Sequence, residues 1–503
     1  MKSQLIPLLS LLPLAAAAQQ QKPNIIVLVA DDLGYGDLSC YGADRVNTPA
    51  VDSIAANGVR FTNMHACAST STPSRYALLT GEYPFRRPGT DVAAGNAGMI
   101  IKPTQTTVAD LMHQAGYATA AIGKWHLGLG SRTAEQDWNG VIDQTPHNLG
   151  FDYHYIMAAT ADRVPCVYIE NGRVAHYDAS APISVSYRQN FEGEPTGKQN
   201  PELLTKLKPS HGHDQSIVNG ISRIGYMKGG GSALWQDESI ADSIVSHAIG
   251  FIDSHRAQPF FMYLCTNDVH VPRMPHKRFR GKSPMGLRGE AILQFDWSVK
   301  QITEALRLRG LDQNTLLIIT SDNGPVLDDG YADQAVELCG SHRPGGPFRG
   351  GKYSAYEAGS AVPFIVYWPQ GAAKGKTSNA LCSLIDVPAS LAALVGSKLH
   401  EGDAPDSQNH LATWLGQNNT PREYAVSMAS NRSLTLRTQH YKYISPSEGG
   451  PMIPWGPKIE TGYRPTPQLF DLSKSAYEQT DISKKSPKIM QRLQRMLGKV
   501  RKN

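Results

Sequence analysis

The segment from residue 71 to residue 81 carries the most specific pattern of chemistry-bearing side chains in this sequence. It reads Ser-Thr-Pro-Ser-Arg-Tyr-Ala-Leu-Leu-Thr-Gly, which places Pro73 two residues and Arg75 four residues after Ser71. Alone, a Ser-x-Pro-x-Arg pattern is more often an ordinary loop that opens a helix, because short motifs have a high false-positive risk. The whole eleven-residue stretch is more specific than this short pattern, and the segments described next agree with it.

Two pairs of oxygen-bearing polar residues follow two strongly apolar runs. Asp31 and Asp32 come directly after the run that ends at Ala30, and Asp322 and Asn323 follow a later run. These four side chains offer hard oxygen donors, without sulfur or imidazole, which favours Ca²⁺ over Zn²⁺, with Mg²⁺ as the runner-up. Either pair alone could equally cap a helix. Three carboxylates and an amide that converge would be a costly cluster without a cation, so the sequence predicts a metal site.

Basic side chains near other apolar runs complete a candidate set for an anionic substrate. Lys124 and His126 stand two residues apart, a spacing that sends both side chains the same way in an extended loop. His270 lies in a loop just after another apolar run, and Lys352 lies in a glycine-rich segment. A lone Lys-x-His is usually a surface feature, so these residues are candidates because of the other segments.

Together, these segments resemble the type I sulfatases of the alkaline phosphatase superfamily, from about Asn24 to Pro369 and in the usual chain order. Residues 71–81 resemble the maturation signature in which a Cys or Ser is oxidised to formylglycine; Ser71 is in register, whereas Cys67 is not. The resemblance implies a calcium site formed by Asp31, Asp32, the modified Ser71, Asp322 and Asn323. It also implies sulfate- and nucleophile-holding roles for Arg75, Lys124 and Lys352, and proton-handling roles for His126 and His270.

The chemistry of sulfate esters explains why that family needs formylglycine. An unmodified serine that attacked the ester would be left as a stable alkyl sulfate, whereas hydrated formylglycine has two hydroxyls on one carbon. One hydroxyl can attack sulfur, and removal of the other proton by His126 then expels sulfate. Calcium would lower the pKa of the attacking hydroxyl, and the basic side chains would offset charge on the sulfate oxygens. His270 is the candidate acid for the leaving alkoxide, although Lys124 or Lys352 could share that role.

The elements that must position these residues have the pattern of an α/β fold. Apolar and β-branched runs predict buried strands, and helical spacing of apolar residues predicts helices between them. The predicted strands are 24–30, 260–264, 315–320 and 364–368, and the predicted helices are 238–254 and 290–308. This alternation predicts a large, mixed, mostly parallel sheet with helices on both faces, the alkaline phosphatase-like architecture that the resemblance implies. Ligands bind beyond the carboxyl ends of such strands, where the acidic pairs lie.

Three segments are predicted along the chain. Residues 1–18 have a lysine, an apolar run and a small-residue end, which is the layout of a secretory signal peptide. Residues 19–422 are the expected catalytic α/β domain. Residues 423–503 change to short alternating runs and a basic helical tail, which predicts a smaller C-terminal α+β subdomain with an antiparallel sheet. The basic tail is interpreted as a solvated helix face.

Composition restricts the class of protein and its location. The net charge of +5 is modest and no base-stacking motif accompanies it, so nucleic-acid binding is not expected. The six cysteines are spread widely without a CxxC pair, which predicts neither a zinc site nor a disulfide scaffold and leaves an isolated bridge open. No stretch after the signal peptide is apolar enough to span a membrane. We therefore expect a periplasmic or otherwise exported protein.

The serine-type signature and the signal peptide together resemble the exported carbohydrate sulfatases of anaerobic bacteria. That resemblance implies a sulfated glycan substrate of the mucin or glycosaminoglycan type, and a cytoplasmic formylglycine-generating enzyme as the maturation partner. Loops around the strand ends should set specificity. The candidate sugar ligands are His176, Glu337, His342, Arg343 and Arg349. Galactose or hexosamine sulfate esters are the expected substrates.

Two alternatives stay open. A phosphodiesterase or phosphonate hydrolase of the same superfamily would share the nucleophile position, but such enzymes tend to carry further His and Asp ligands for two metals. A non-catalytic protein that binds sulfated glycans would be expected to have a broken site, whereas every expected polar position is filled here. The sequence leaves open the sugar, the sulfate position, exo or endo action and the oligomeric state.

Overall fold

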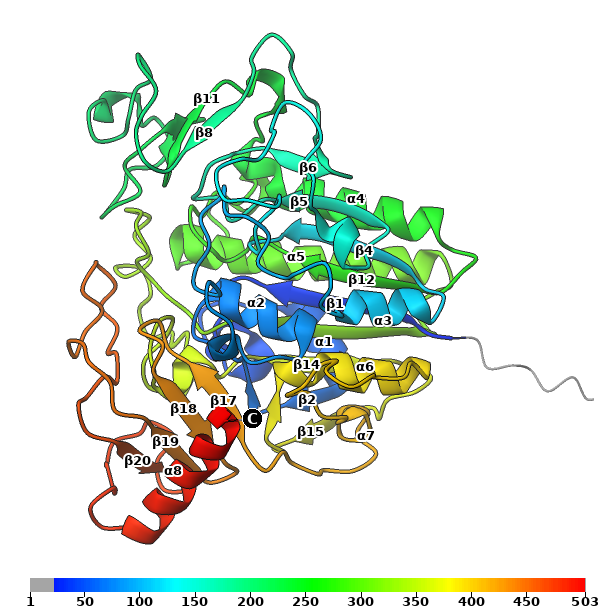
Figure 1. The fold of residues 1–503 in the computed structure, drawn as a ribbon, viewed down its shortest axis with the longest axis vertical. Helices are drawn as coiled ribbons and strands as arrows, with labels where there is room; N and C mark the ends of the chain where they lie inside the picture. The colour runs from blue at the N-terminus through cyan, green and yellow to red at the C-terminus, as the bar shows by residue number, and fades with distance from the viewer. Residues whose placement is uncertain (1–21, 503) are drawn as a thin grey trace, which may run out of the picture.

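The computed structural model describes residues 22–502 of the chain (Figure 1). The predicted signal peptide, residues 1–18, lies outside the described residues. Among the residues that are described, no helix has the length and apolar character that a membrane crossing requires. All six cysteines are free.

A ten-stranded sheet forms the centre of the molecule. In spatial order, its strands are β15 (Lys376–Ser378), β2 (Val59–Phe61), β14 (Phe364–Tyr367), β13 (Thr315–Ser321), β1 (Asn24–Ala30), β12 (Phe260–Cys265), β4 (Ala118–Lys124), β5 (Tyr153–Met157), β6 (Tyr168–Glu170) and β7 (Arg173–Val174). The five strands from β13 to β5 are parallel, whereas β14, β6 and β7 pair in the antiparallel sense. The predicted mixed, mostly parallel sheet is therefore confirmed.

The central strands are buried on both faces, as their continuous apolar runs predict. Every residue of β1, β4, β12 and β13 is buried. Two groups of helices cover the sheet (Figure 1): α1 (Pro49–Asn57), α4 (Ile240–Ser254) and α5 (Gly286–Leu308) pack together, and so do α2 (Ser71–Thr80), α3 (Val108–Gln114) and α6 (Val387–Val395). Both predicted helices are present as α4 and α5, and the second begins four residues earlier than predicted.

A separate antiparallel sheet follows near the C-terminus. It consists of β17 (Ala425–Met428), β18 (Leu434–Arg437), β19 (Tyr441–Ile444) and β20 (Gln468–Asp471), and the last helix, α8 (Pro487–Lys502), packs on it. Leu436 of this sheet and Leu493 of α8 share an apolar cluster with Ala77 of α2. The small sheet is thereby attached to the helix that begins at Ser71, which places its hairpins beside the site described below.

The remaining elements are short and lie in the connections. They are the pairs β3 (Met64–His65) with β16 (Cys382–Ser383), β8 (Ser184–Ser186) with β11 (Tyr226–Lys228), and β9 (Ile217–Val218) with β10 (Ile221–Ser222), and the helix α7 (Leu411–Trp414). Several of them belong to the segment between β7 and α4, which contributes His213 and Ile224 to the pocket described below.

Candidate active site

The carboxyl ends of four parallel strands meet at one edge of the large sheet. The last residues of β1 and β13 are paired, so that Asp31 and Asp322 emerge side by side. On the other side of β1, β12 leads into the loop that holds His270, and β4 ends at Lys124. Residues from widely separated parts of the chain therefore meet at this edge, as expected for an open α/β sheet.

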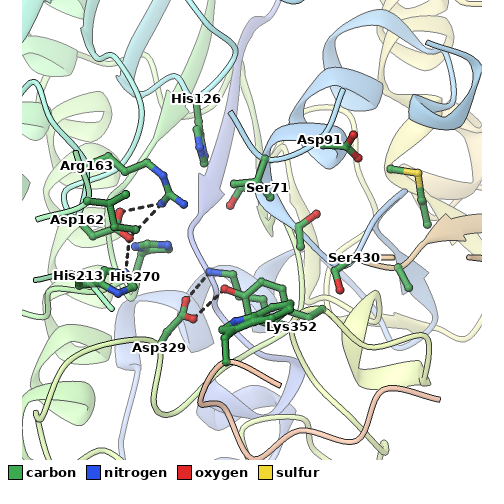
Figure 2. A pocket seen from close by; sticks show the side chains of 17 residues that line it. Ser71, Asp91, His126, Asp162, Arg163, His213, His270, Asp329, Lys352 and Ser430 are labelled. Carbon is green, nitrogen blue, oxygen red and sulfur yellow. Dashed lines mark hydrogen bonds and ion pairs between the residues drawn. The ribbon is translucent and has the colours of Figure 1, made fainter. Parts of the chain in front are cut away.

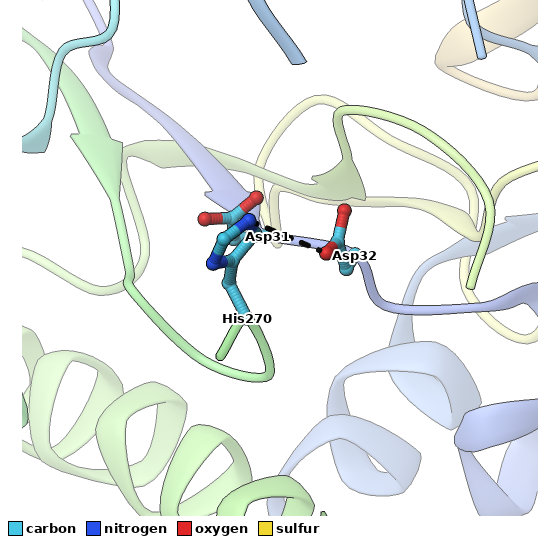
Figure 3. A group of neighbouring side chains, drawn as sticks. All are labelled: Asp31, Asp32 and His270. Carbon is cyan, nitrogen blue, oxygen red and sulfur yellow. Dashed lines mark ion pairs between the residues drawn. The ribbon is translucent and has the colours of Figure 1, made fainter. Parts of the chain in front are cut away.

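Three buried carboxylates form the centre of the site. Asp31, Asp32 and Asp322 are each at most 1% exposed. The backbone N–H of Asp32 donates to Asp322 Oδ1 at 3.2 Å, and Asn323 Nδ2 donates to Asp32 Oδ1 at 2.8 Å. His270 Nε2 lies 3.6 Å from Asp32 Oδ2 (Figure 3). Candidate ligand atoms of Asp31, Asp32 and His270 lie within 4.8 Å of one another, a spacing that a single metal ion can bridge.

Three buried cations pair with these carboxylates, one with each. The contacts are Lys124 Nζ to both oxygens of Asp31 (2.7 and 2.6 Å), Arg75 Nε to Asp322 Oδ2 (2.9 Å), and Lys352 Nζ to Asp32 Oδ2 (2.7 Å). Buried charges in proteins are normally paired in this way, because an unpaired one is costly. The pairing also holds three positive groups around one point, where they can face an anion.

Burial perturbs the charges of this cluster unevenly. Burial raises the pKa of Asp31 although Lys124 opposes the shift, and burial likewise lowers the pKa of Lys124 in spite of Asp31. Burial would also raise the pKa of Asp322, but Arg75 and Lys124 outweigh it and hold that pKa below its ordinary value. The charge of Asp31 is therefore the one that Lys124 offsets incompletely, and a bound cation would offset the remainder.

The donor set fits a hard cation. Asp31, Asp32, Asp322 and Asn323 bring carboxylate and amide oxygens to one place, and Ser71 Oγ lies 3.4 Å from both Asp31 Oδ1 and Asn323 Oδ1. Oxygen ligands of this kind are those that Ca²⁺ and Mg²⁺ take in proteins. The set of metal ligands predicted from the sequence contains no imidazole. In the structure, however, the loop after β12 brings the imidazole of His270 close to Asp32.

Ser71 occupies a position suited to an oxygen nucleophile. It is the first residue of the ten-residue helix α2, and it is 3% exposed. Lys124 Nζ donates a hydrogen bond to Ser71 Oγ at 2.9 Å. The positive end of the helix dipole and this ammonium group both stabilise negative charge on an oxygen at residue 71.

His126 is arranged as a neutral base. Its Nε2 lies 2.9 Å from the carbonyl oxygen of Ala93; a carbonyl only accepts, so Nε2 carries the hydrogen and Nδ1 presents a lone pair. Nδ1 is buried and has no hydrogen-bond partner among the described residues. Burial, helped by Lys124, lowers the pKa of His126 well below its ordinary value, which keeps the ring neutral.

Of these groups, Ser71, His126, His270 and Lys352 line a pocket of about 450 Å³ (Figure 2). Asp162, Arg163 and His213 form one wall, and Asp91 and Ser430 stand on the opposite side. The other lining residues are Thr70, Ser71, Val92, His126, Ile224, His270, Asp329, Lys352, Tyr353, Met428, Ala429 and Trp455. The volume lies within the range of small-molecule sites, and the polar lining suits a hydroxylated ligand.

The wall formed by Asp162, Arg163 and His213 was not predicted from the sequence. Arg163 and His213 both contact Asp162, with Arg163 NH1 at 3.1 Å and His213 Nε2 at 2.9 Å from its Oδ2. All three lie between β5 and α4, the part of the chain from which the sequence predicts only His176 as a sugar ligand. The adjacent Asp-Arg pair is the signal that could have found this wall, because two opposite charges next to each other suit polar recognition.

The predicted sugar ligands do not line the pocket. His176 and Arg343 are exposed elsewhere, and Glu337 lines a different cavity. Arg349 forms an ion pair with Glu460, with Nε donating to Oε2 at 2.7 Å. None of these four residues lines the pocket, because surface position and local pairing direct their side chains elsewhere, and their role as sugar ligands stays a prediction.

His342 does not line the pocket, because its side chain is buried against Asp37. Its ring is fully buried, with Nε2 2.7 Å from Asp37 Oδ1, and Arg288 forms two further hydrogen bonds to the same carboxylate. Burial alone would raise the pKa of Asp37, but Arg288 and His342 lower it to about 2. This cluster supports the segment that follows Asp31 and Asp32, so His342 acts on the fold and does not face the ligand.

The fold and the site together define a class of enzyme. A nucleophile at a helix N-terminus, three cations around it and an oxygen-rich cluster beneath it suit the hydrolysis of esters of a tetrahedral oxyanion. A sequence model of the family named Sulfatase matches residues 23–397. The chain belongs to the sulfatase family and is a sulfuric ester hydrolase.

Similar proteins agree with this assignment. The chain is 50% identical over 509 residues to an N-acetylgalactosamine-6-O-sulfatase of Bacteroides thetaiotaomicron, with 99% of each chain covered. It is 30% identical over 512 residues to arylsulfatase H of Canis lupus familiaris, with 92% of this chain and 87% of the relative covered. A solved sulfatase structure described with the metabolism of multiple glycosaminoglycans by B. thetaiotaomicron superposes with a TM-score of 0.94 at 52% identity, covering 96% of this chain and 100% of that one.

Proposed function

We propose that this sulfatase removes the 6-O-sulfate of N-acetylgalactosamine residues in a glycan, with formylglycine derived from Ser71 and with Ca²⁺. The observation that carries this proposal is the pocket itself, in which an oxyanion-binding floor lies below a wall of sugar-type polar ligands (Figure 2). The sugar is suggested by the 50%-identical relative, whose name specifies that ester. N-acetylgalactosamine is a hexosamine with the galactose configuration, so it falls within the expected substrates.

The wall formed by Asp162, Arg163 and His213 is suited to sugar hydroxyls. Asp162 is 1% exposed and its carboxylate accepts hydrogen bonds, while the guanidinium of Arg163 donates them. Their mutual contact fixes both side chains before a ligand arrives, which reduces the entropy lost on binding. A sugar hydroxyl between the two groups can donate a hydrogen bond to the carboxylate and accept one from the guanidinium. This wall would therefore favour sugars in which one hydroxyl has the orientation that allows both hydrogen bonds.

Calcium would be held by Asp31, Asp32, Asp322, Asn323 and the side chain of residue 71. When bound, Ca²⁺ supplies a Lewis acid that lowers the pKa of a coordinated hydroxyl and takes up sulfate charge. Formylglycine supplies, when hydrated, two hydroxyls on one carbon at the N-terminus of α2. The residues of the chain itself have the remaining tasks.

Lys124, Arg75 and Lys352 stabilise negative charge around residue 71. Lys124 Nζ, 2.9 Å from Ser71 Oγ, stands next to the attacking oxygen and stabilises it as it loses its proton. Lys352 lines the pocket and faces the sulfate oxygens. Arg75 is fully buried behind Asp322, where it orients that carboxylate and adds positive potential without touching the substrate's sugar.

Two histidines are placed to move protons. The free Nδ1 of His126 accepts the proton of the second hydroxyl at residue 71, the step that releases sulfate. His270 lines the pocket near Asp329 and Lys352 (Figure 2), and it is the proposed acid for the leaving alcohol. Lys124 and Lys352 remain alternative acids for that step.

The maturation and the location of the protein are part of the proposal. A serine at position 71 would be oxidised by an oxygen-sensitive formylglycine-generating enzyme in the cytoplasm, before export directed by residues 1–18. Oxidation must precede folding, because Ser71 is only 3% exposed once the site has formed.

A panel of sulfated monosaccharides tests the proposed substrate. Matured protein should release sulfate from N-acetylgalactosamine 6-sulfate faster than from the 4-sulfate or from N-acetylglucosamine 6-sulfate, and should leave a phosphodiester intact. Asp162→Asn should reduce kcat/KM for the preferred sugar by about 10- to 100-fold, from the loss of a charged hydrogen bond worth about 1.5–3 kcal/mol. His176→Asn is the matched control, because His176 lies outside the pocket. Equal rates on all three sugars would contradict the proposed specificity, and phosphodiester turnover alone would contradict the sulfatase chemistry.

A further inference from the structure

The C-terminal helix α8 separates apolar and basic residues onto opposite faces. Its buried residues are Met490, Leu493, Leu497 and Val500, which pack in the apolar cluster of the four-stranded sheet. Lys488, Arg492, Arg495, Lys499 and Lys502 follow the same three- and four-residue spacing on the other side of the helix, and all five are exposed. We call these five residues the basic face of α8; it is about 21 Å long at 1.5 Å per residue.

The positive charge of the whole protein is concentrated there. From residue 484 to residue 502 there are eight Lys and Arg residues and no Asp or Glu. Because the net charge of the chain is +5, the rest of the sequence carries a net charge of −3. Within residues 22–502, none of these eight cations forms an ion pair with a carboxylate. Ordinary solvated faces mix both signs, so this composition calls for a different explanation.

Helix stability does not supply that explanation. Lys488 and Arg492, and Arg495 and Lys499, are like charges at a spacing of four residues, an arrangement that destabilises a helix. Lys488 also lies in the first turn, which contains no acidic residue, and there the helix dipole disfavours a cation. The basic face is therefore kept at a cost to the fold, which is expected of a surface that binds an anionic partner.

A second cavity lies between the hairpin that borders the catalytic pocket and α8. Ser430 lines the pocket, and the neighbouring Arg432 lines this second cavity, of about 980 Å³, which Arg501 of α8 lines from its other side. Arg432 NH1 pairs with Asp91 Oδ1 at 2.7 Å on the border between the two cavities. A chain that leaves the pocket on the side of Asp91 and Ser430 (Figure 2) would meet Arg432 first and then Arg501, which precedes Lys502 of the basic face in sequence.

We propose that the basic face of α8 is a second binding site, for the polyanionic part of the sulfated glycan whose end occupies the catalytic pocket. The proposal rests on the proposed function for the identity of that glycan. Its acidic groups, repeated along the chain, complement five cations in a row, and the attraction would raise the rate of capture of long substrates at low salt. A monosaccharide is too short to reach α8, so its hydrolysis would not depend on this face.

The test compares two variants with the same change in net charge. In the first, all five residues of the basic face are changed to Gln. In the matched control, five exposed lysines elsewhere are changed to Gln, namely Lys277, Lys282, Lys300, Lys374 and Lys398. Binding is measured with Ser71→Ala protein on immobilised chondroitin 6-sulfate over a salt gradient. The basic-face variant should elute at lower salt than the parent and the control.

Kinetics on substrates of different length complete the test. At low salt, the basic-face variant should lose on the order of 10-fold in kcat/KM on size-fractionated chondroitin 6-sulfate, while its activity on the sulfated monosaccharide stays unchanged. Equal elution of both variants would overturn the proposal, and so would salt-sensitive binding to anionic phospholipid vesicles with none to the glycan. Failure of the parent to hydrolyse the monosaccharide would instead contradict the proposed function, independently of the binding result.

Discussion

Replacing Lys352 by Met separates the structural and the catalytic role of one buried ammonium group. Lys352 Nζ donates to Asp32 Oδ2 at 2.7 Å and to Asp329 Oδ2 at 2.8 Å, and all three side chains are at most 7% exposed. Burial alone would lower the pKa of Lys352, but Asp32 and Asp329 outweigh it and raise that pKa well above its ordinary value. The lysine is therefore charged at every pH of interest, and its loss leaves two buried carboxylates without their cation.

The structural cost follows from the burial of the pair. Breaking a buried ion pair from one side costs about 3–5 kcal/mol. For roughly 480 residues at about 2.1 cal/mol/K each, the unfolding entropy is about 1 kcal/mol/K, so Lys352→Met should lower Tm by about 3–5 °C. Lys352→Met with Asp329→Asn should recover part of that loss, because one unpaired carboxylate is removed. Lys398→Met, at an exposed site, is the control and should leave Tm unchanged.

The catalytic cost should not be recovered by the second change. If Lys352 stabilises sulfate charge, kcat should fall by about 100- to 1,000-fold in the single and in the double variant. Scanning calorimetry and sulfate release on the same preparations measure both effects. A double variant that regains activity along with stability would refute the catalytic role, and a single variant as stable as the parent would refute the structural one.

Three further predictions concern the base, the cation and the support of the site. His126→Ala should reduce kcat by about 100- to 10,000-fold and leave sulfate covalently bound to residue 71, which mass spectrometry of the quenched enzyme would show. A residue 71 peptide without bound sulfate at steady state would contradict the role of His126 as the base. Ca²⁺ at about 100 times its Kd should raise the free energy of unfolding by about 2.7 kcal/mol and therefore raise Tm by about 3 °C. Asp322→Asn should abolish that rise. A Tm of the parent protein that does not depend on Ca²⁺ would contradict the metal site. The pKa of Asp37 is lowered from 3.8 to about 2, so its contribution, about 2 kcal/mol, is present above pH 3.8 and is lost as the pH falls through 2. The stability gap between the parent and Asp37→Asn, measured by denaturant titration, should therefore narrow by that amount between pH 6 and pH 2; a constant gap would show that Asp37 is not held as an ion pair.

The floor of the site was predictable because it lies at the ends of strands. The apolar runs that predict β1 and β13 also locate Asp31, Asp32 and Asp322, since the carboxyl ends of parallel strands meet at one edge. Nothing beyond short-range pattern and a known order of motifs was needed to collect these residues. The same reasoning placed the large sheet and both long helices.

The pocket wall formed by Asp162, Arg163 and His213 was not predictable in the same way. Arg163 and His213 lie in a segment of short strands and turns without apolar periodicity, so the contact between His213 and Asp162, which are 51 residues apart, could not be inferred. The sequence predicts His342 as a sugar ligand. Its true partner, Asp37, is 305 residues away in sequence, and only the folded structure shows that this pair is buried.

The proposed mechanism requires residue 71 to be formylglycine, and the mass of the proteolytic peptide that contains it reports this modification. The protein should be produced in an anaerobic host that has a serine-type maturation enzyme, with Ser71→Ala as the reference. The peptide of the active protein should be lighter by two hydrogens than the same peptide with an unmodified Ser71. Sulfatase activity should scale with the fraction of the protein that carries this modification. Full sulfatase activity with an unmodified Ser71 would contradict the proposed mechanism.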